Sequence, residues 1–247
     1  MTPDILLGIF LIFCRIGGCM LIAPALSSSR IPPQIRLFMA LSVSLALSPV
    51  LLDKVASGVA GLAPAEMLSW IAAELLAGLL IGLLARVYFF ALQTMLGAVS
   101  MALSYGGMPG TPLDEAEPLP AISSLIMMVA TAAIFLADLH WELFRGMIAS
   151  YSRIPIGQGI VLQSSLAELV DQASAAFVVA LRISSPFLVY SIIVNLMAGL
   201  MNKLTPQIPV FFIATPFVMC GGLFVMYFSS QDYVLLFLEA FSSWLRG

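Results

Sequence analysis

Charged residues are scarce in this sequence. Only 9% of its 247 residues are Asp, Glu, Lys or Arg, whereas 61% are hydrophobic. A soluble domain carries about 25% charged residues, because its surface faces water. A bilayer must therefore replace water as the solvent for much of this chain. Regular alternation of polar and apolar residues, which is typical of a membrane β-barrel, is also missing. The sequence predicts an all-α integral membrane protein.

Patterns that bind nucleic acid, hold metals or perform catalysis are missing as well. The net charge is −3 and no run of Lys or Arg occurs, which argues against a nucleic-acid partner. The only histidine, His140, is not part of a zinc motif, and Cys14, Cys19 and Cys220 all lie in apolar runs. No Gly-x-Ser-x-Gly elbow or phosphate-binding loop is present. We therefore expect no enzyme activity, no catalytic or cofactor-binding residue, no metal site and no cofactor.

Six apolar stretches reach or approach the roughly 20 residues that a helix needs to span a bilayer. They cover residues 5–26, 37–52, 67–103, 121–148, 173–201 and 208–228. The third is long enough for one long kinked helix or for a tight pair of helices. A last apolar stretch, residues 233–245, predicts a separate short helix. We expect about six apolar helices, arranged in hairpins.

Charged residues interrupt several of these stretches: Arg15, Glu74, Arg86, Asp138, Glu142, Arg145 and Arg182. At a helix centre each Asp, Lys or Arg costs roughly 2.5–3.5 kcal/mol of insertion free energy, while Leu, Ile, Phe or Val gains about 0.3–0.6 kcal/mol. In the first stretch, the insertion free energy gained by the apolar residues exceeds the cost of Arg15. In the fourth stretch, three charges cost more than the apolar residues gain. We therefore expect the fourth stretch to require protein or water around it.

The charges of the fourth stretch follow a helical spacing. Asp138, Glu142 and Arg145 occur at i, i+4 and i+7, which places them within about 60° of one another on a single helix. Glu142 and Arg145 can also form an ion pair at i, i+3. This stripe is either a structural ion pair between helices or the polar lining of a conduit. Elsewhere, Gly78 and Gly82 have the Gly-xxx-Gly spacing of close helix packing, within the chain or against another subunit.

Three passages, which together span nearly the whole chain, carry a family resemblance. The first runs over residues 13–36 and contains Arg15 and Pro32-Pro33. The second covers residues 138–157. The third covers residues 180–222 and includes the segment Asn202-Lys-Leu-Thr-Pro-Gln207. In these passages the chain resembles the FliR/SctT family of type III secretion export gate subunits, which includes the flagellar biosynthetic protein FliR.

The resemblance implies one export gate domain over residues 1–247. Residues 1–172 would form a FliP-like part, fused to a FliQ-like helical hairpin at residues 173–247. It implies a pore subunit that assembles with FliP and FliQ homologues and conducts unfolded flagellar proteins. Contacts with a FliB/FlhB-type export switch protein and an FlhA-type export protein are implied too. The expected location is the bacterial inner membrane, within the flagellar basal body, with the gate facing the periplasm.

In the resembled family, the loop after the long third apolar region acts as a pore plug. The resemblance assigns this role here to Gly106, Gly107, Met108, Pro109 and Gly110. Glycine permits backbone conformations that are closed to other residues, methionine fills irregular gaps, and proline opposes helix formation. An ordinary surface loop is the alternative interpretation.

Two other functions fit the same composition. An equivalent subunit of a virulence secretion system would be distinguished by the genes that surround the coding sequence. A secondary transporter for a small solute could use Arg15, Asp138 and Arg182 as substrate or proton sites. Such transporters often contain two similar halves, and no internal repeat is evident here. Purification separates the transporter from a gate subunit, because only a gate subunit should bring several copies of two other membrane proteins with it.

Overall fold

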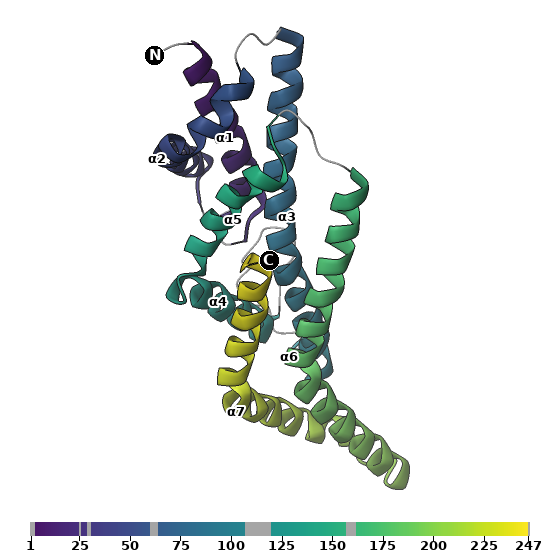
Figure 1. Ribbon diagram of the computed structural model, residues 1–247. Helices are drawn as coiled ribbons and strands as arrows, with labels where there is room; N and C mark the ends of the chain where they lie inside the picture. Colours follow the sequence, from purple (N-terminus) through teal and green to yellow (C-terminus); the bar gives the residue numbers. More distant parts are fainter. Residues whose placement is uncertain are drawn as a thin grey trace. The chain divides into compact units, whose positions relative to one another are not determined.

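The computed structural model is built from α-helices (Figure 1). It describes residues 3–24, 26–28, 31–59, 64–106, 120–156 and 162–246. Within these ranges the secondary-structure elements are all α-helices, which confirms the all-α prediction. The helices are α1 (Pro3–Ile22), α2 (Pro33–Val59), α3 (Pro64–Ala102), α4 (Ala121–Leu136), α5 (Leu139–Arg153), α6 (Leu162–Leu204) and α7 (Val210–Arg246).

Local sequence explains how these helices begin and how they hold polar residues. Three of them, α1, α2 and α3, begin at a proline, whose backbone angle suits the first helical position and whose missing N–H is not needed there. Serine hydroxyls inside the apolar helices donate back to carbonyls of their own helix. In α2, for example, Ser44 Oγ donates to Leu41 O and Ser48 Oγ to Leu45 O, each at 2.8 Å. These bonds satisfy hydroxyl groups that are buried away from water.

Five helices are long and apolar enough to cross a membrane, and six spans result if α4 and α5 count as one broken span. This result confirms the prediction of about six apolar helices. Three candidate spans are unusually long: Glu66–Ala102, Ser165–Leu204 and Val210–Leu245, with 37, 40 and 36 residues. At 1.5 Å per residue they are about 54–60 Å long, nearly twice the roughly 30 Å of a bilayer core.

Two expectations about segment boundaries were wrong. The stretch 121–148 is two helices, because Asp138 has a left-handed backbone (φ 56°) and separates α4 from α5. Aspartate is one of the few residues that tolerate this conformation. Asp138 therefore precedes the helix that carries Glu142 and Arg145, and the three do not form one helical stripe. Residues 233–245 are not a separate helix either, since α7 continues through them with no Pro or Gly to end it.

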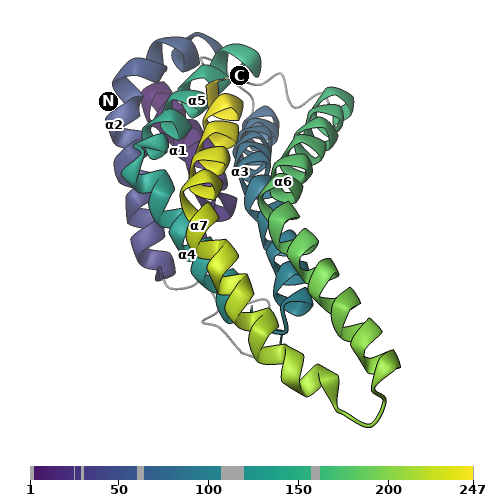
Figure 2. The ribbon, with the colours of Figure 1, turned by 90° about the horizontal axis from the view of Figure 1, so that it is seen from below.

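The chain forms two compact units. Unit 1 comprises Met1–Val87, Asp138–Ala173 and Leu245–Gly247, and unit 2 comprises Tyr88–Ala137 and Ser174–Trp244. In unit 1, α1 lies between α2 and the first part of α3 (Figure 2). In unit 2, α6 and α7 run antiparallel as a hairpin (Figure 2). The division into FliP-like and FliQ-like parts remains a prediction.

Candidate functional site: a buried arginine network

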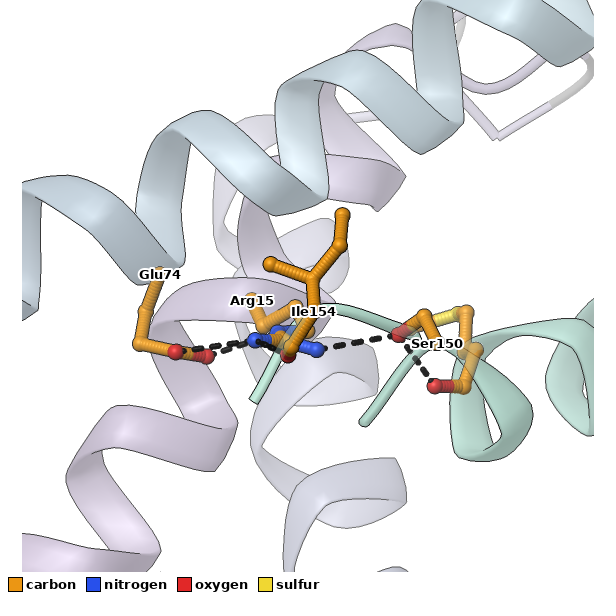
Figure 3. A network of polar contacts seen from close by, with 5 residues as sticks. Arg15, Glu74, Ser150 and Ile154 are labelled. Carbon is orange, nitrogen blue, oxygen red and sulfur yellow. Dashed lines mark hydrogen bonds and ion pairs between the residues drawn. The ribbon is translucent and has the colours of Figure 1, made fainter. Parts of the chain in front are cut away.

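Arg15 of α1 is fully buried in unit 1, although it belongs to an apolar helix. Its guanidinium faces Glu74 of α3, which is also buried (Figure 3). Arg15 Nε donates to Glu74 Oε2 at 2.6 Å, and Nη2 donates to Oε1 at 2.9 Å. This two-point geometry is the strongest form of an arginine–carboxylate pair. The pair has no net charge, so neither ion is left uncompensated in the interior.

The remaining donors of Arg15 reach the end of α5. Nη1 donates to Ser150 Oγ at 3.1 Å, and Nη2 donates to the backbone carbonyl of Ile154 at 3.0 Å (Figure 3). Ser150 Oγ in turn donates to Met147 O at 2.6 Å. The ring of Tyr151 lies 3.9 Å from the guanidinium carbon, within the range of a cation–π contact. One side chain thus joins α1, α3 and the end of α5.

Glycines bring α1 and α3 close enough for this network. A Cβ added at Gly78 would overlap the backbone carbonyl of Arg15, and one at Gly18 would lie 2.6 Å from Leu75 O. Gly82 approaches the backbone of Cys19 as closely. Glu74, Gly78 and Gly82 recur every four residues and so share one face of α3. The Gly-xxx-Gly spacing predicted close packing, and the structure places that packing within the chain.

The other charged residues of the apolar stretches lie apart from this network. Glu142 and Arg145 of α5 form the predicted i, i+3 ion pair at 2.9 Å, with Arg145 exposed. Asp138 is exposed in the turn before α5, and Arg86 is half-buried on α3. Arg182 is exposed on the part of α6 that belongs to unit 2.

Of the predicted plug residues, only Gly106 belongs to the described part of the chain. Gly107, Met108, Pro109 and Gly110 lie outside it. The residues just before Gly106 are held against α7 within unit 2.

Two close contacts attach this end of α3 to α7. Tyr105 Oη donates to Met219 O at 2.8 Å, and Leu103 packs so closely on Gly222 that an added Cβ would lie 2.8 Å from Leu103 Cδ1. Burial raises the pKa of the Tyr105 hydroxyl, with smaller contributions from Cys220 and Tyr190. The hydroxyl therefore stays protonated and remains a donor.

Sequence reasoning did not identify the partners of Arg15. Glu74 was recognised as a charge in an apolar stretch but was not assigned to Arg15. The spacing of Glu74 with Gly78 and Gly82 was an available signal. A charged residue on the same helix face as two packing glycines lies against the helix that packs there, so its partner is expected on that helix. Ser150 and the carbonyl of Ile154 gave no comparable signal. The network holds helices together by an ion pair and hydrogen bonds. Within the described ranges, no group of three or more His, Cys, Asp or Glu residues could hold a metal ion.

Comparison with known proteins gives a consistent family. The sequence profile of the family described as "Bacterial export proteins, family 1" matches residues 6–244. A flagellar biosynthetic protein FliR of Caulobacter vibrioides is 25% identical over 94% of this chain and 91% of the relative. FliR of Escherichia coli is 24% identical over 83% of this chain and 77% of the relative. FliR of Aquifex aeolicus is 26% identical over 92% and 87% respectively.

The profile match covers almost all of the chain, and the relatives align over most of their own length. The long apolar helices agree with a protein that is embedded in a membrane. The chain therefore belongs to family 1 of the bacterial export proteins, as a FliR-family component of the flagellar export apparatus.

Proposed function

We propose that this chain is a non-enzymatic pore subunit of the flagellar type III protein export gate. It assembles with FliP and FliQ homologues in the bacterial inner membrane, within the flagellar basal body, with the gate facing the periplasm. The assembled gate conducts unfolded flagellar proteins. FlhB-type and FlhA-type export proteins are further partners. The flagellar relatives favour this function over the equivalent role in a virulence system.

The observation that carries the proposal is the exposed apolar surface of α6 and α7. Large apolar side chains are exposed along both helices, up to 80% at Leu204 and 83% at Phe212. The two candidate spans are 40 and 36 residues long, about 60 and 54 Å. A bilayer core covers only about 30 Å. Lipid can therefore cover only part of this surface, and companion subunits are required for the remainder.

Purification tests the assembly directly. The tagged chain is extracted from its native membrane in a mild detergent, and the accompanying proteins are identified and counted by mass spectrometry. We expect FliP and FliQ homologues, each in several copies. Recovery as a stable, solitary monomer would contradict the proposal, and so would a small homo-oligomer, which a secondary transporter would form.

Ion leakage tests the plug. We propose that residues 106–110 restrict the closed pore, as the family resemblance implies. Deleting these five residues in cells that overproduce the whole complex should raise the leakage of ions or small solutes above that of the intact complex at matched abundance. Unchanged conductance would remove the plug from the proposal while leaving the assembly untouched.

A further inference from the structure

Three of the described helices contain a proline in their interior: Pro49 in α2, Pro186 in α6 and Pro216 in α7. All three prolines lie within candidate membrane spans. A proline has no backbone N–H, so the carbonyl four residues earlier loses its usual donor. In a membrane that carbonyl must find another donor, because water does not reach it. The residue directly before each proline carries a hydroxyl group: Ser48, Ser185 and Thr215.

Two of these hydroxyl groups bond to the carbonyl that the proline has freed. In α2 the freed carbonyl belongs to Leu45, and Ser48 Oγ donates to Leu45 O at 2.8 Å. In α6 it belongs to Arg182, and Ser185 Oγ donates to Arg182 O, also at 2.8 Å. The serine thus supplies the hydrogen bond that the proline removes. Ser48 is buried, whereas Ser185 is exposed.

The third proline does not have this arrangement. Pro216 frees the carbonyl of Phe212, but Thr215 Oγ1 donates to Phe211 O at 2.7 Å, one residue earlier. A hydroxyl group next to a proline is therefore not sufficient. Its bond must also reach the carbonyl four residues before the proline, as it does in α2 and α6.

Other serines make the same short bond where no proline follows. Ser44 Oγ donates to Leu41 O at 2.8 Å in α2, and Ser191 Oγ donates to Leu188 O at 2.9 Å in α6. In a regular helix those carbonyls also accept a backbone N–H from four residues later. The serine bond is an addition there, whereas before Pro49 and Pro186 it is a replacement.

The proline of α6 lies where the direction of the hairpin is set. α6 does not run straight in either view (Figures 1 and 2). Sharp kinks in helices occur mostly at proline, and Pro186 is near the middle of this helix. The next residue, Phe187, is buried and packs on Tyr233 of α7, with the rings 5.3 Å apart. The part of α6 after the proline is about 27 Å long, so a kink of about 20° displaces its end by about 9 Å.

We propose that Ser48–Pro49 and Ser185–Pro186 are two bend points, in which the serine hydroxyl replaces the backbone donor that the proline removes. The proline bends the helix, and the serine keeps the bend from leaving a carbonyl unpaired away from water. The serine therefore contributes strongly to stability only while the proline follows it. In α6 this pair fixes the direction of the hairpin beyond Phe187. The inference concerns the chain itself and does not depend on the proposed function.

A double-mutant cycle tests the pair in α2, measured as unfolding of the purified complex in mild detergent. Ser48→Ala should lower the ratio of folded to unfolded protein about tenfold, because Leu45 O loses its donor. Pro49→Ala restores a backbone N–H, so Ser48→Ala in that background should change the ratio less than about twofold. Ser48→Thr keeps a hydroxyl and should keep most of the stability, which separates the lost bond from failed folding.

The same cycle applies to the pair in α6. Ser185→Ala should lower the ratio about threefold, a smaller loss than at Ser48 because water can partly replace an exposed hydroxyl. In the Pro186→Ala background this loss should disappear.

Two matched controls separate the proposed bond from a general effect of serine or threonine. Ser44→Ala, combined with Pro49→Ala, should show no coupling, since Ser44 bonds to a carbonyl that keeps its backbone donor. Thr215→Val, combined with Pro216→Ala, should also show none, because Thr215 does not bond to the freed carbonyl.

A distance measurement tests the bend in α6. Spin labels replace Val178 and Leu204, which are 46% and 80% exposed. These positions are 26 residues apart, or about 39 Å in a straight helix. The unmodified chain should give a shorter distance, and Pro186→Ala should move it towards the straight value. Pro49→Ala, which lies in a different helix, should leave it unchanged.

Three results would overturn the inference: a loss from Ser48→Ala or Ser185→Ala that persists without the proline, an equal coupling in the control cycles, or a label distance that Pro186→Ala does not change. None of these measurements requires a particular companion subunit. Failure here leaves the proposed function intact, and failure to recover companions leaves the two bend points intact.

Discussion

The two arginines, Arg15 in unit 1 and Arg182 in unit 2, pose the same problem in different settings. Each interrupts an apolar helix at a cost of roughly 2.5–3.5 kcal/mol on the insertion scale. Arg15 is compensated within the chain by a carboxylate, a hydroxyl, a carbonyl and an aromatic ring. Arg182 is exposed and has no described partner. The arginine of unit 1 is therefore compensated within the chain, whereas no described residue compensates the arginine of unit 2.

A similar contrast in apolar burial holds between α1 and the α6–α7 hairpin. Around Arg15, α1 buries large side chains such as Leu11, Ile12, Ile16 and Met20 almost completely. The α6–α7 hairpin instead exposes a succession of Phe, Leu, Ile and Met side chains. Apolar surface of this extent on the hairpin needs cover from lipid, and under the proposed function from companion subunits as well. Substitutions in the two units should therefore be detected by different measurements.

The largest effect should follow from breaking the Arg15–Glu74 pair. Glu74→Gln leaves the guanidinium buried without its anion and should lower the free energy of unfolding by about 3–5 kcal/mol. The measurement is unfolding of the purified complex in mild detergent, supported by the amount of protein that accumulates in the membrane. Arg15→Met combined with Glu74→Leu should recover much of the loss, because it removes both ions. A loss below about 1 kcal/mol for Glu74→Gln would mean that unit 1 does not depend on the pair.

A substitution that disturbs the close packing of α1 and α3 should have the next largest effect on stability. Gly18→Ala forces a Cβ to within 2.6 Å of Leu75 O, while Gly17, the adjacent residue, has open space around its Cβ position. We expect Gly18→Ala to cost about 1–3 kcal/mol of stability through overpacking. Gly17→Ala is the matched control and should be neutral or slightly stabilising, since alanine favours helix over glycine. Equal effects at both positions would show that the helices do not pack at this distance.

The sequence predicted the fold class well because the signals were long and uniform. Apolar runs of about 20 residues identify membrane helices whatever their tertiary neighbours are. The errors lay where a single residue decided the backbone. Asp138 ends α4 by adopting a left-handed conformation, which a hydrophobic pattern does not reveal. The segment around Ser229 and Asp232 was expected to interrupt α7, but polar residues without Pro or Gly do not stop a helix.

The candidate site was less predictable for a physical reason. The members of the network come from three helices, and 59 residues separate Arg15 from Glu74 and 139 separate it from Ile154. A sequence pattern shows which residues share a helix face, but not which faces meet. The glycine spacing at Gly78 and Gly82 indicated a close contact without naming its partner helix. Ile154 contributes only a backbone carbonyl, which every residue has, so no side-chain pattern could have identified it.

A smaller effect is expected in unit 2, where Tyr105 holds the end of α3 to α7. Tyr105→Phe removes the donor to Met219 O and should cost about 0.5–1.5 kcal/mol of stability. Tyr227→Phe is the control, because its ring is 76% exposed. The measurement is unfolding of the purified complex in mild detergent, compared between the two variants. If the loss equals the effect of Tyr227→Phe, the hydrogen bond does not stabilise this end of α3.

The smallest effect should come from the Glu142–Arg145 ion pair, and it sharpens the contrast between buried and exposed charge. This pair has nearly the same N–O distance as Arg15 Nη2 and Glu74 Oε1, 2.9 Å, but the Arg145 side chain is 75% exposed. Exposed pairs contribute about 0.2–1 kcal/mol, and salt screens them. Glu142→Gln should therefore lower stability by no more than about 1 kcal/mol, and less at high ionic strength. A loss that matches Glu74→Gln and does not respond to salt would show that assembly buries this pair, and α5 would then be a second surface covered by a companion subunit.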